Sequence, residues 1–166
     1  MRKVTLIYQQ TYHIRNFKPT DLTFVTEINR SCLPENYTSG FFMDIYQNCP
    51  EGFLIAEMNS HIIGYSMVRI ELGFSEFNRM KIVRKAHLVS IAIIGPYRRL
   101  GVAFSLLTRT LKVLYSRGIK ECFLEVRNTN SAGIALYEKM GFKGMRTLPS
   151  YYQDGADALL MAKQLS

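Results

Sequence analysis

Cysteine is scarce in this sequence, and its three cysteines lie far apart at positions 32, 49 and 122. No pair has C-x-x-C spacing, so neither a zinc site nor a disulfide framework is indicated, and reduced, partly buried thiols are expected. Long apolar runs are also missing, and none approaches the ~18 residues of a membrane-spanning helix. The first residues lack the apolar core and cleavage site of a secretory signal. These absences favour a cytoplasmic protein with no metal site and no membrane partner.

Size and composition indicate one globular domain over residues 1–166. About half of the 166 residues are apolar, at 48%, which is enough for a continuous core. The formal net charge of +8 makes anionic partners plausible, among them nucleotides, nucleic acid and a ribosomal surface. Net charge informs solubility and steering rather than fold, so it leaves an unspecialised basic protein equally open.

Apolar periodicity and turn residues predict alternating strands and helices. Strands are expected at 12–17, at two places within 52–74 around a turn at Asn59–Ser60, and at 83–94, 120–127, 142–148 and 157–165. Helices are expected at 19–30, at 39–49 opened by Ser39, from residue 100 to the stop at Gly118, and at 130–141. This order predicts a mixed α/β fold, with about four helices around one mostly antiparallel sheet that contains a single central β-α-β crossover.

Two patterns predict which side chains share a face. Apolar residues spaced by 4, 3, 4 and 3 are expected to form the buried stripe of the helix from residue 100, namely Leu100, Phe104, Leu107, Leu111 and Leu114. Strict strand alternation is expected to place His87 on one face with Val89, Ile91 and Ile93.

The stretch "YRRLGVAFSLL", residues 97–107, places positive charge and small residues at the start of a helix. A helix N-terminus presents unpaired N–H groups, and glycine lets the backbone approach a ligand closely. Arg98 and Arg99 add donors suited to phosphate. Together with Gly101 and Ala103, they indicate a diphosphate cradle. A capped helix with solvated arginines is the alternative, because such a short pattern also occurs by chance.

A second segment, "NSAGIALYEKMGF" at residues 130–142, follows the next expected strand. With both segments in this order, the chain resembles the GNAT superfamily of N-acetyltransferases over nearly its whole length. The resemblance implies the GNAT fold, with a sheet splayed at the crossover, and acetyl-CoA as cosubstrate. It departs from the family pattern at Gly133, where alanine is usual, and a slightly weaker helix is expected there.

The resemblance also implies which residues contact acetyl-CoA. Backbone N–H groups of an open strand edge at Ile91, Ala92 and Ile93 would bind the thioester carbonyl. The remaining implied contacts are Arg98, Arg99, Leu100, Gly101, Val102, Ala103, Phe104, Asn130 and Tyr137.

Further segments, from "LPENYT" at 33–38 to "YYQDGADALLMA" at 151–162, resemble the catalytic subunit of the major N-terminal acetyltransferases, especially the archaeal stand-alone form. This implies transfer of an acetyl group by direct attack, in a ternary complex, to the free α-amine of protein or peptide N-termini. Those N-termini include nascent chains at a ribosome. Ala156 departs from these relatives, which have an acidic residue there.

The chemistry of the acceptor fits an N-terminus. A protein α-amine has a pKa near 8, so about a tenth of it is neutral at pH 7, whereas a lysine amine is neutral in less than about 0.1% of molecules. Modest base catalysis therefore favours N-termini, although a lysine side chain or a small-molecule amine stays open as the acceptor. A basic nucleic-acid-binding module is a further alternative, but RNA-recognition aromatic motifs and a basic helix stripe are missing.

The resemblance suggests roles for individual side chains. Glu35 would act as base or orient the substrate amine, and His87 with Glu125 would form a second base set, paired through one water across neighbouring strands. Tyr137 would act as the acid that protonates the departing thiolate. Tyr37, Tyr151 and Tyr152 would line the peptide entrance.

Overall fold

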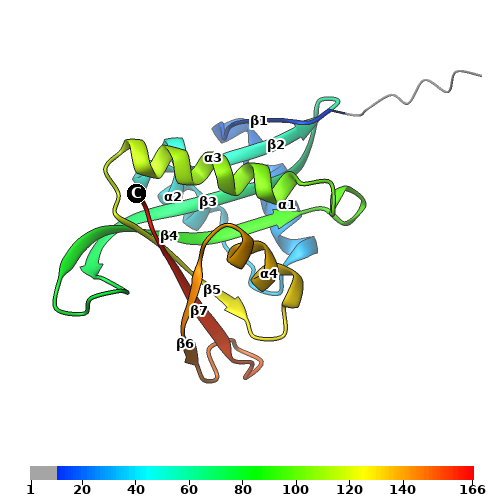
Figure 1. The fold of residues 1–166 in the computed structure, drawn as a ribbon. Coiled ribbons are helices and arrows are strands. Elements are labelled where there is room, and N and C mark those ends of the chain that lie inside the picture. The colour runs from blue at the N-terminus through cyan, green and yellow to red at the C-terminus, as the bar shows by residue number, and fades with distance from the viewer. Residues whose placement is uncertain (1–10) are drawn as a thin grey trace, which may run out of the picture.

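In the computed structural model, which describes residues 11–166, seven strands form one sheet (Figure 1). The strands are β1 (His13–Asn16), β2 (Leu54–Met58), β3 (His61–Phe74), β4 (Ile82–Ile93), β5 (Glu121–Arg127), β6 (Lys143–Leu148) and β7 (Ala158–Gln164). Their order in space is β1-β2-β3-β4-β5-β7-β6, and every neighbouring pair is antiparallel except β4 with β5. The expected mostly antiparallel sheet with one crossover is confirmed.

Four α-helices within the described residues connect the strands. They are α1 (Leu22–Cys32), α2 (Ser39–Asn48), α3 (Val102–Ser116) and α4 (Ser131–Lys139). None of the helices in residues 11–166 is long and apolar enough to cross a membrane. The expectation about a secretory signal concerns a segment that begins with residues 1–10, which lie outside the described residues.

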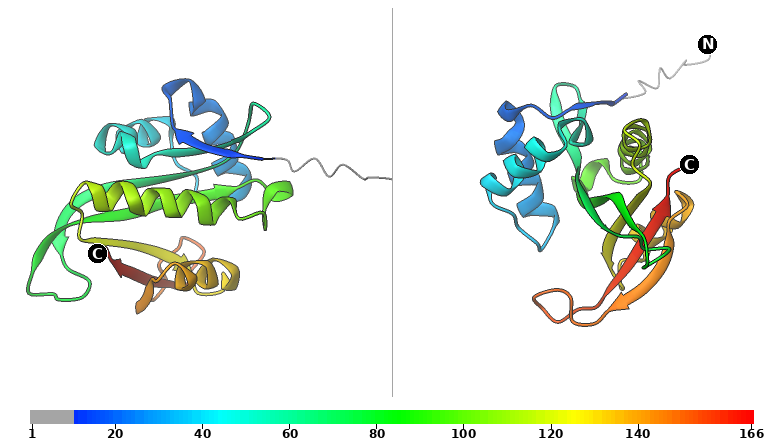
Figure 2. Two further views of the ribbon diagram at one scale, coloured as in Figure 1. Left: turned by 45° about the horizontal axis from the view of Figure 1, so that its top comes forward. Right: turned by 90° about the vertical axis from the view of Figure 1, so that its left-hand side faces the viewer.

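Helices cover both faces of the sheet (Figure 2). On the face of α1 and α2, Phe42, Phe53 and Tyr65 belong to one buried cluster. On the face of α3 and α4, Leu107 and Tyr137 share another. The sheet therefore separates two cores, and a site that uses residues from both faces must pass through it.

Local signals set several boundaries. Asn59 and Ser60 both have positive φ, +50° and +64°, and form the expected tight turn between β2 and β3. The start of α2 is capped by Thr38, whose Oγ1 accepts the N–H of Phe41 at 3.2 Å. Ser39 is therefore the first helical residue rather than the cap.

β4 contains an extra residue at Val89, where its register with β3 shifts. Before this bulge, Leu88 packs toward α3 and α4, and beyond it Ile91 and Ile93 pack toward α3. The neighbouring His87 therefore lies on the opposite face. The expected face shared by His87 with Ile91 and Ile93 is wrong, because alternation changes phase at a bulge.

β4 and β5 run side by side only briefly. Their parallel ladder pairs residues 85–87 with 121–123 and ends there. Beyond this point the strands diverge (Figure 1), and β5 continues its pairing with β7. Among the described strands none pairs with residues 88–93 on this side, so part of the β4 edge is open to a ligand.

The buried face of α3 agrees with the expected stripe at Leu107 and Leu114, with Leu111 packed against the same core, and differs from it at the start of the helix. Its buried residues are Val102, Leu106, Leu107, Thr110 and Leu114. Leu100 precedes the helix and is 55% exposed, and Phe104 is 40% exposed. The helix begins only after Gly101, whose φ is +79°, so Leu100 lies outside it, and Phe104 in the first turn lies off the buried face.

We expect Leu106→Ala to lower the free energy of unfolding by about 2–5 kcal/mol, because it empties a fully buried position. The same substitution at exposed Leu100 is the control, with an expected change within about 0.5 kcal/mol. Urea denaturation measures both. An equal loss of unfolding free energy in Leu100→Ala would mean that Leu100 is buried as well, as the sequence pattern predicted.

Candidate active site

A cavity of about 890 Å³ lies where β4 and β5 part. Its walls come from the α1–α2 loop, β4, β5, α4 and the β6–β7 loop. Of the residues expected at the site, it is lined by Glu35, Tyr37, His87, Ile91, Glu125, Asn130, Tyr137, Tyr151 and Tyr152. Ala92, Ile93 and residues 98–104 are not among its lining residues. One space thus reaches from the loop that follows α1 to a helix on the other face of the sheet.

Glu35 lies in the α1–α2 loop, and a buried amide holds this loop in place. The Nδ2 of Asn29 donates to the carbonyl of Glu35 at 3.2 Å, and its Oδ1 accepts the N–H of Tyr37 at 3.1 Å. Asn29 also donates to the hydroxyl of Tyr65, which pairs with Ser90 of β4 at 2.8 Å. Because these groups are buried and mutually satisfied, they fix the loop to the sheet.

Arg127 at the end of β5 joins the two loops at the cavity mouth. Its Nη2 donates to Glu35 Oε1 at 2.7 Å, and its Nη1 donates to Asp154 Oδ2 at 2.8 Å. Its guanidinium lies over the ring of Tyr152, with Cζ 4.1 Å from the ring centroid. Hydrogen bonds from the Ala156 N–H and from Arg127 lower the pKa of Asp154, and the bond to Glu35 raises that of Arg127. Both groups are therefore charged at neutral pH.

The sequence reasoning missed Arg127. A signal was present, because alternation along β5 places Arg127 on the same face as Glu125 and Phe123. Its Nε is buried and has no hydrogen-bond partner among the described residues. Such a group is costly to leave unpaired, so a substrate carbonyl or a water at this point would be stabilising.

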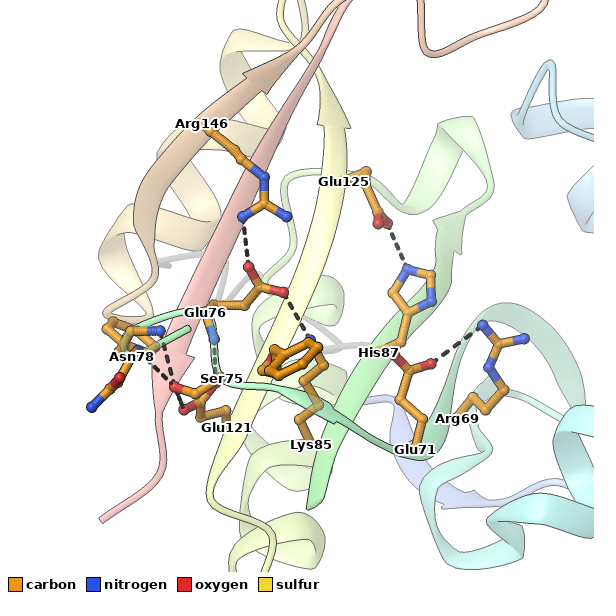
Figure 3. Close-up of polar contacts among 12 residues, drawn as sticks. Arg69, Glu71, Ser75, Glu76, Asn78, Lys85, His87, Glu121, Glu125 and Arg146 are labelled. Carbon is orange, nitrogen blue, oxygen red and sulfur yellow. Dashed lines mark hydrogen bonds and ion pairs between the residues drawn. The ribbon is translucent and has the colours of Figure 1, made fainter. Parts of the chain in front are cut away.

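His87 and Glu125 contact each other directly. The Nε2 of His87 lies 2.5 Å from Glu125 Oε2, and both side chains are mostly buried (Figure 3). The expected water between them is therefore replaced by a direct hydrogen bond. The carboxylate fixes which ring nitrogen points toward it, and this determines the orientation of the imidazole.

Tyr137 lines the cavity from α4 and is 8% exposed. Burial raises its pKa to about 12. A thiol has a pKa of about 8.5, so complete proton transfer from this phenol to a thiolate is unfavourable. The environment of Tyr137 therefore suits a hydrogen-bond donor better than the expected proton donor.

Tyr37, Tyr151 and Tyr152 all line the cavity. Tyr37 stacks on Phe41 with ring centroids 4.6 Å apart, and Tyr151 meets Tyr152 edge to face at 5.0 Å. Burial raises the pKa of each of the three hydroxyls, so all stay neutral donors at physiological pH. They offer apolar area together with hydroxyls, which suits an extended peptide.

The turn before α3 leaves its backbone open to a ligand. Arg99 and Gly101 both have positive φ, +65° and +79°, and Arg99 does so at a cost on the order of 1–2 kcal/mol. No side chain caps α3, so its first N–H groups remain available. A Cβ at Gly101 would approach only the hydroxyl of Tyr12 within 4 Å, so a ligand can come close there.

Side chains near this turn have structural partners. Arg98 Nε donates to the carbonyl of Ile93 at 2.8 Å and ties the turn to the end of β4. Asn130 caps α4 by accepting the N–H of Gly133 at 2.9 Å. A Cβ at residue 133 would lie 2.6 Å from the Asn130 amide, so glycine accommodates this cap. Glycine at position 133, where the family usually has alanine, therefore leaves room for the Asn130 side chain to cap α4.

Comparisons with known proteins agree with this geometry. A model of the Acetyltransferase (GNAT) family matches residues 22–142. The chain belongs to this family. The GNAT match covers the α1–α2 loop, the turn before α3 and the whole motif at residues 130–142.

Individual GNAT relatives are similar over almost the whole chain. An N-alpha-acetyltransferase of Sulfurisphaera tokodaii is 44% identical over 156 residues, which cover 93% of each chain. Ard1 from Thermoplasma volcanium has a TM-score of 0.82 at 27% identity and covers 93% of this chain and 98% of its own. Chaetomium thermophilum Naa20, solved with a bisubstrate analogue, has a TM-score of 0.81 at 28% identity over 92% and 86% of the two chains.

These matches confirm three expectations. The fold is the GNAT fold, acetyl-CoA is the cosubstrate, and the activity is that of an N-terminal acetyltransferase, whose acceptors are protein or peptide N-termini. The turn at 98–101 and the unpaired N–H groups of α3 fit the diphosphate of acetyl-CoA.

We expect Arg127→Met to lower kcat/KM for a peptide about 10- to 100-fold, because it frees both loops and leaves Glu35 without its partner. The KM for acetyl-CoA should stay within about twofold. Arg117→Met, which removes a pair with Glu51 outside the cavity lining, is the control and should behave as wild type. Steady-state kinetics with unchanged peptide kcat/KM would contradict this role of Arg127.

Proposed function

We propose that the protein transfers the acetyl group of acetyl-CoA directly to a free α-amine held in the cavity between β4 and β5. The observation that carries this proposal is that Glu35, the His87–Glu125 pair, Tyr137 and Asn130 all line the same cavity. Acid–base groups and cosubstrate contacts thereby meet in one space, as a ternary complex requires.

Two bases are available to the amine in this proposal. Glu35 lies at the mouth, and its carboxylate is oriented by Arg127. His87 lies deeper in the gap and is oriented by Glu125. About a tenth of an α-amine is neutral at pH 7 and can attack without prior deprotonation. Either base can remove a proton from the protonated amines, and can take the proton that the attacking nitrogen loses as the amide forms.

Acetyl-CoA supplies a thioester whose acetyl group passes to the amine. Residues 98–104 hold its diphosphate through backbone N–H groups, with Arg98 fixing the turn to β4. Backbone N–H groups at the open edge of β4, around residues 91–93, donate to the thioester carbonyl. The early end of the β4–β5 ladder supports this assignment, because it leaves that edge unpaired. Asn130, at the start of α4, provides a further contact with acetyl-CoA from the wall of the cavity.

Tyr137 stabilises the departing sulfur in this mechanism by donating a hydrogen bond. Its raised pKa supports this role, because the phenol keeps its proton throughout. Tyr37, Tyr151 and Tyr152 hold the first residues of the acceptor at the mouth.

The cavity that receives the acceptor is lined by three carboxylates and one arginine, namely Glu35, Glu125, Asp154 and Arg127. This excess of negative charge attracts the cationic form of an N-terminus. Acceptors that emerge from a ribosome belong to the proposal, and the net charge of +8 supports an approach to an RNA-rich surface. We treat residues 1–166 as one acetyltransferase domain, because a single sheet takes strands from His13 to Gln164.

We expect Glu35→Gln and His87→Ala each to lower kcat by about 10- to 100-fold on a peptide with a free N-terminal serine, because each removes a base. The KM for acetyl-CoA should change little, since neither residue lies in the turn before α3. Initial rates at saturating acetyl-CoA measure the effect.

Matched controls carry the same substitutions away from the cavity. Glu27→Gln on the exposed side of α1 and His61→Ala in the β2–β3 hairpin should keep wild-type kcat. Full activity in both Glu35→Gln and His87→Ala would contradict the assignment of bases. Loss in one variant alone would identify a single base.

A further inference from the structure

The ring of Phe123 lies flat against the imidazole of His87. Phe123 is on β5 and pairs in register with His87 across the short parallel ladder. The two ring centroids are 4.6 Å apart, and the planes are inclined by only 2°. Phe123 is 7% exposed, so its ring is held by its surroundings rather than free to rotate away.

This stack restricts rotation of the His87 ring about its χ2 angle, which the backbone does not fix. The χ2 angle of histidine is broad and roughly two-fold, so packing alone rarely selects one orientation. Here the ring is stacked on Phe123 and hydrogen-bonded to Glu125 at 2.5 Å. The two contacts together leave a single direction for the outer ring nitrogen.

Lys85 contacts the Phe123 ring and belongs to an ion cluster with Glu76 and Arg146 (Figure 3). The ammonium of Lys85 is 4.6 Å from the centroid of the Phe123 ring, and its side chain is 8% exposed. It donates to the carbonyl of Phe74 and to Glu76 Oε1, both at 2.8 Å. Glu76 Oε2 in turn accepts from Arg146 of β6 at 2.7 Å.

The cluster joins three parts of the fold at one carboxylate. Burial opposes ionisation of Glu76, but hydrogen bonds from Lys85 and Arg146 outweigh it and lower its pKa. The Glu76 carboxylate is therefore charged at neutral pH. A buried ion pair of this kind contributes little net stability compared with apolar side chains of similar volume. Its directional contacts do fix where the Lys85 ammonium lies, and thus where Phe123 is held.

We propose that Phe123 is a positioning residue for the base His87, and that Lys85, held by Glu76, keeps the Phe123 ring in place. This inference rests on the proposed role of His87 and adds that the imidazole acts only in the orientation set by the stack.

A double-mutant cycle tests the inference on the full chain. We expect Phe123→Leu to lower kcat about tenfold, with the KM for acetyl-CoA unchanged. In the His87→Ala background the same substitution should have no further effect, because its target is gone. Phe123→Tyr keeps the stacked ring and should restore most of kcat. Lys85→Met should give a smaller loss that also disappears in the His87→Ala background.

A spectroscopic readout separates positioning from folding. In wild type the ring current of Phe123 should shift the His87 ring protons upfield, and this shift should be lost in Phe123→Leu and reduced in Lys85→Met. NMR spectra of these protons measure it without any turnover. If Phe123→Leu does not fold, Lys85→Met and Phe123→Tyr carry the test.

The possible failures are distinguishable. Wild-type kcat in His87→Ala would overturn the proposed base, and with it the functional part of this inference. A strong loss in His87→Ala together with wild-type kcat in Phe123→Leu would overturn the positioning role alone. A further loss on adding Phe123→Leu to His87→Ala would show that Phe123 acts on the fold in general.

Discussion

The parting of β4 and β5 is the constraint on which the rest of this structure depends. Strands that stayed paired would close the sheet and separate its two faces. Because pairing ends at residues 87 and 123, one cavity takes walls from both faces. The bulge at Val89 adds to this, since it changes the phase of β4 just beyond the last pair. His87 can therefore face the cavity while Ile91 packs toward α3.

Directional polar contacts join the two loops at the cavity mouth to each other and to the sheet. Asn29 fixes the loop that carries Glu35, and Arg127 ties this loop to Asp154 on the opposite side. Such groups contribute little net stability, but they leave few alternative geometries. The same logic applies deeper in the gap, where a stack and a carboxylate orient His87. The geometry of the cavity thus depends on a small set of directional contacts.

Local rules made most of the fold predictable from the sequence, and long-range contacts limited the rest. Turn residues and periodicity predicted the order of all strands and helices, because these signals lie within a few residues of one another. The first turn of α3 was predicted wrongly because the helix begins only after Gly101, so Leu100 lies outside it. The face that His87 shares with Ile91 and Ile93 was predicted wrongly because the bulge at Val89 changes the alternation. Arg127 and Phe123 were not predicted because their contacts, with Glu35 and Asp154 and with His87, join residues far apart in the sequence.

The most direct test of the account is acetyl transfer from acetyl-CoA to one peptide in two forms. One form has a free N-terminal serine, and the other has a blocked N-terminus and an internal lysine. The account predicts turnover on the free N-terminus alone, because the cavity offers modest base catalysis that a mostly protonated lysine cannot use. Turnover on the blocked lysine peptide alone would contradict the α-amine as acceptor while leaving the family unchanged.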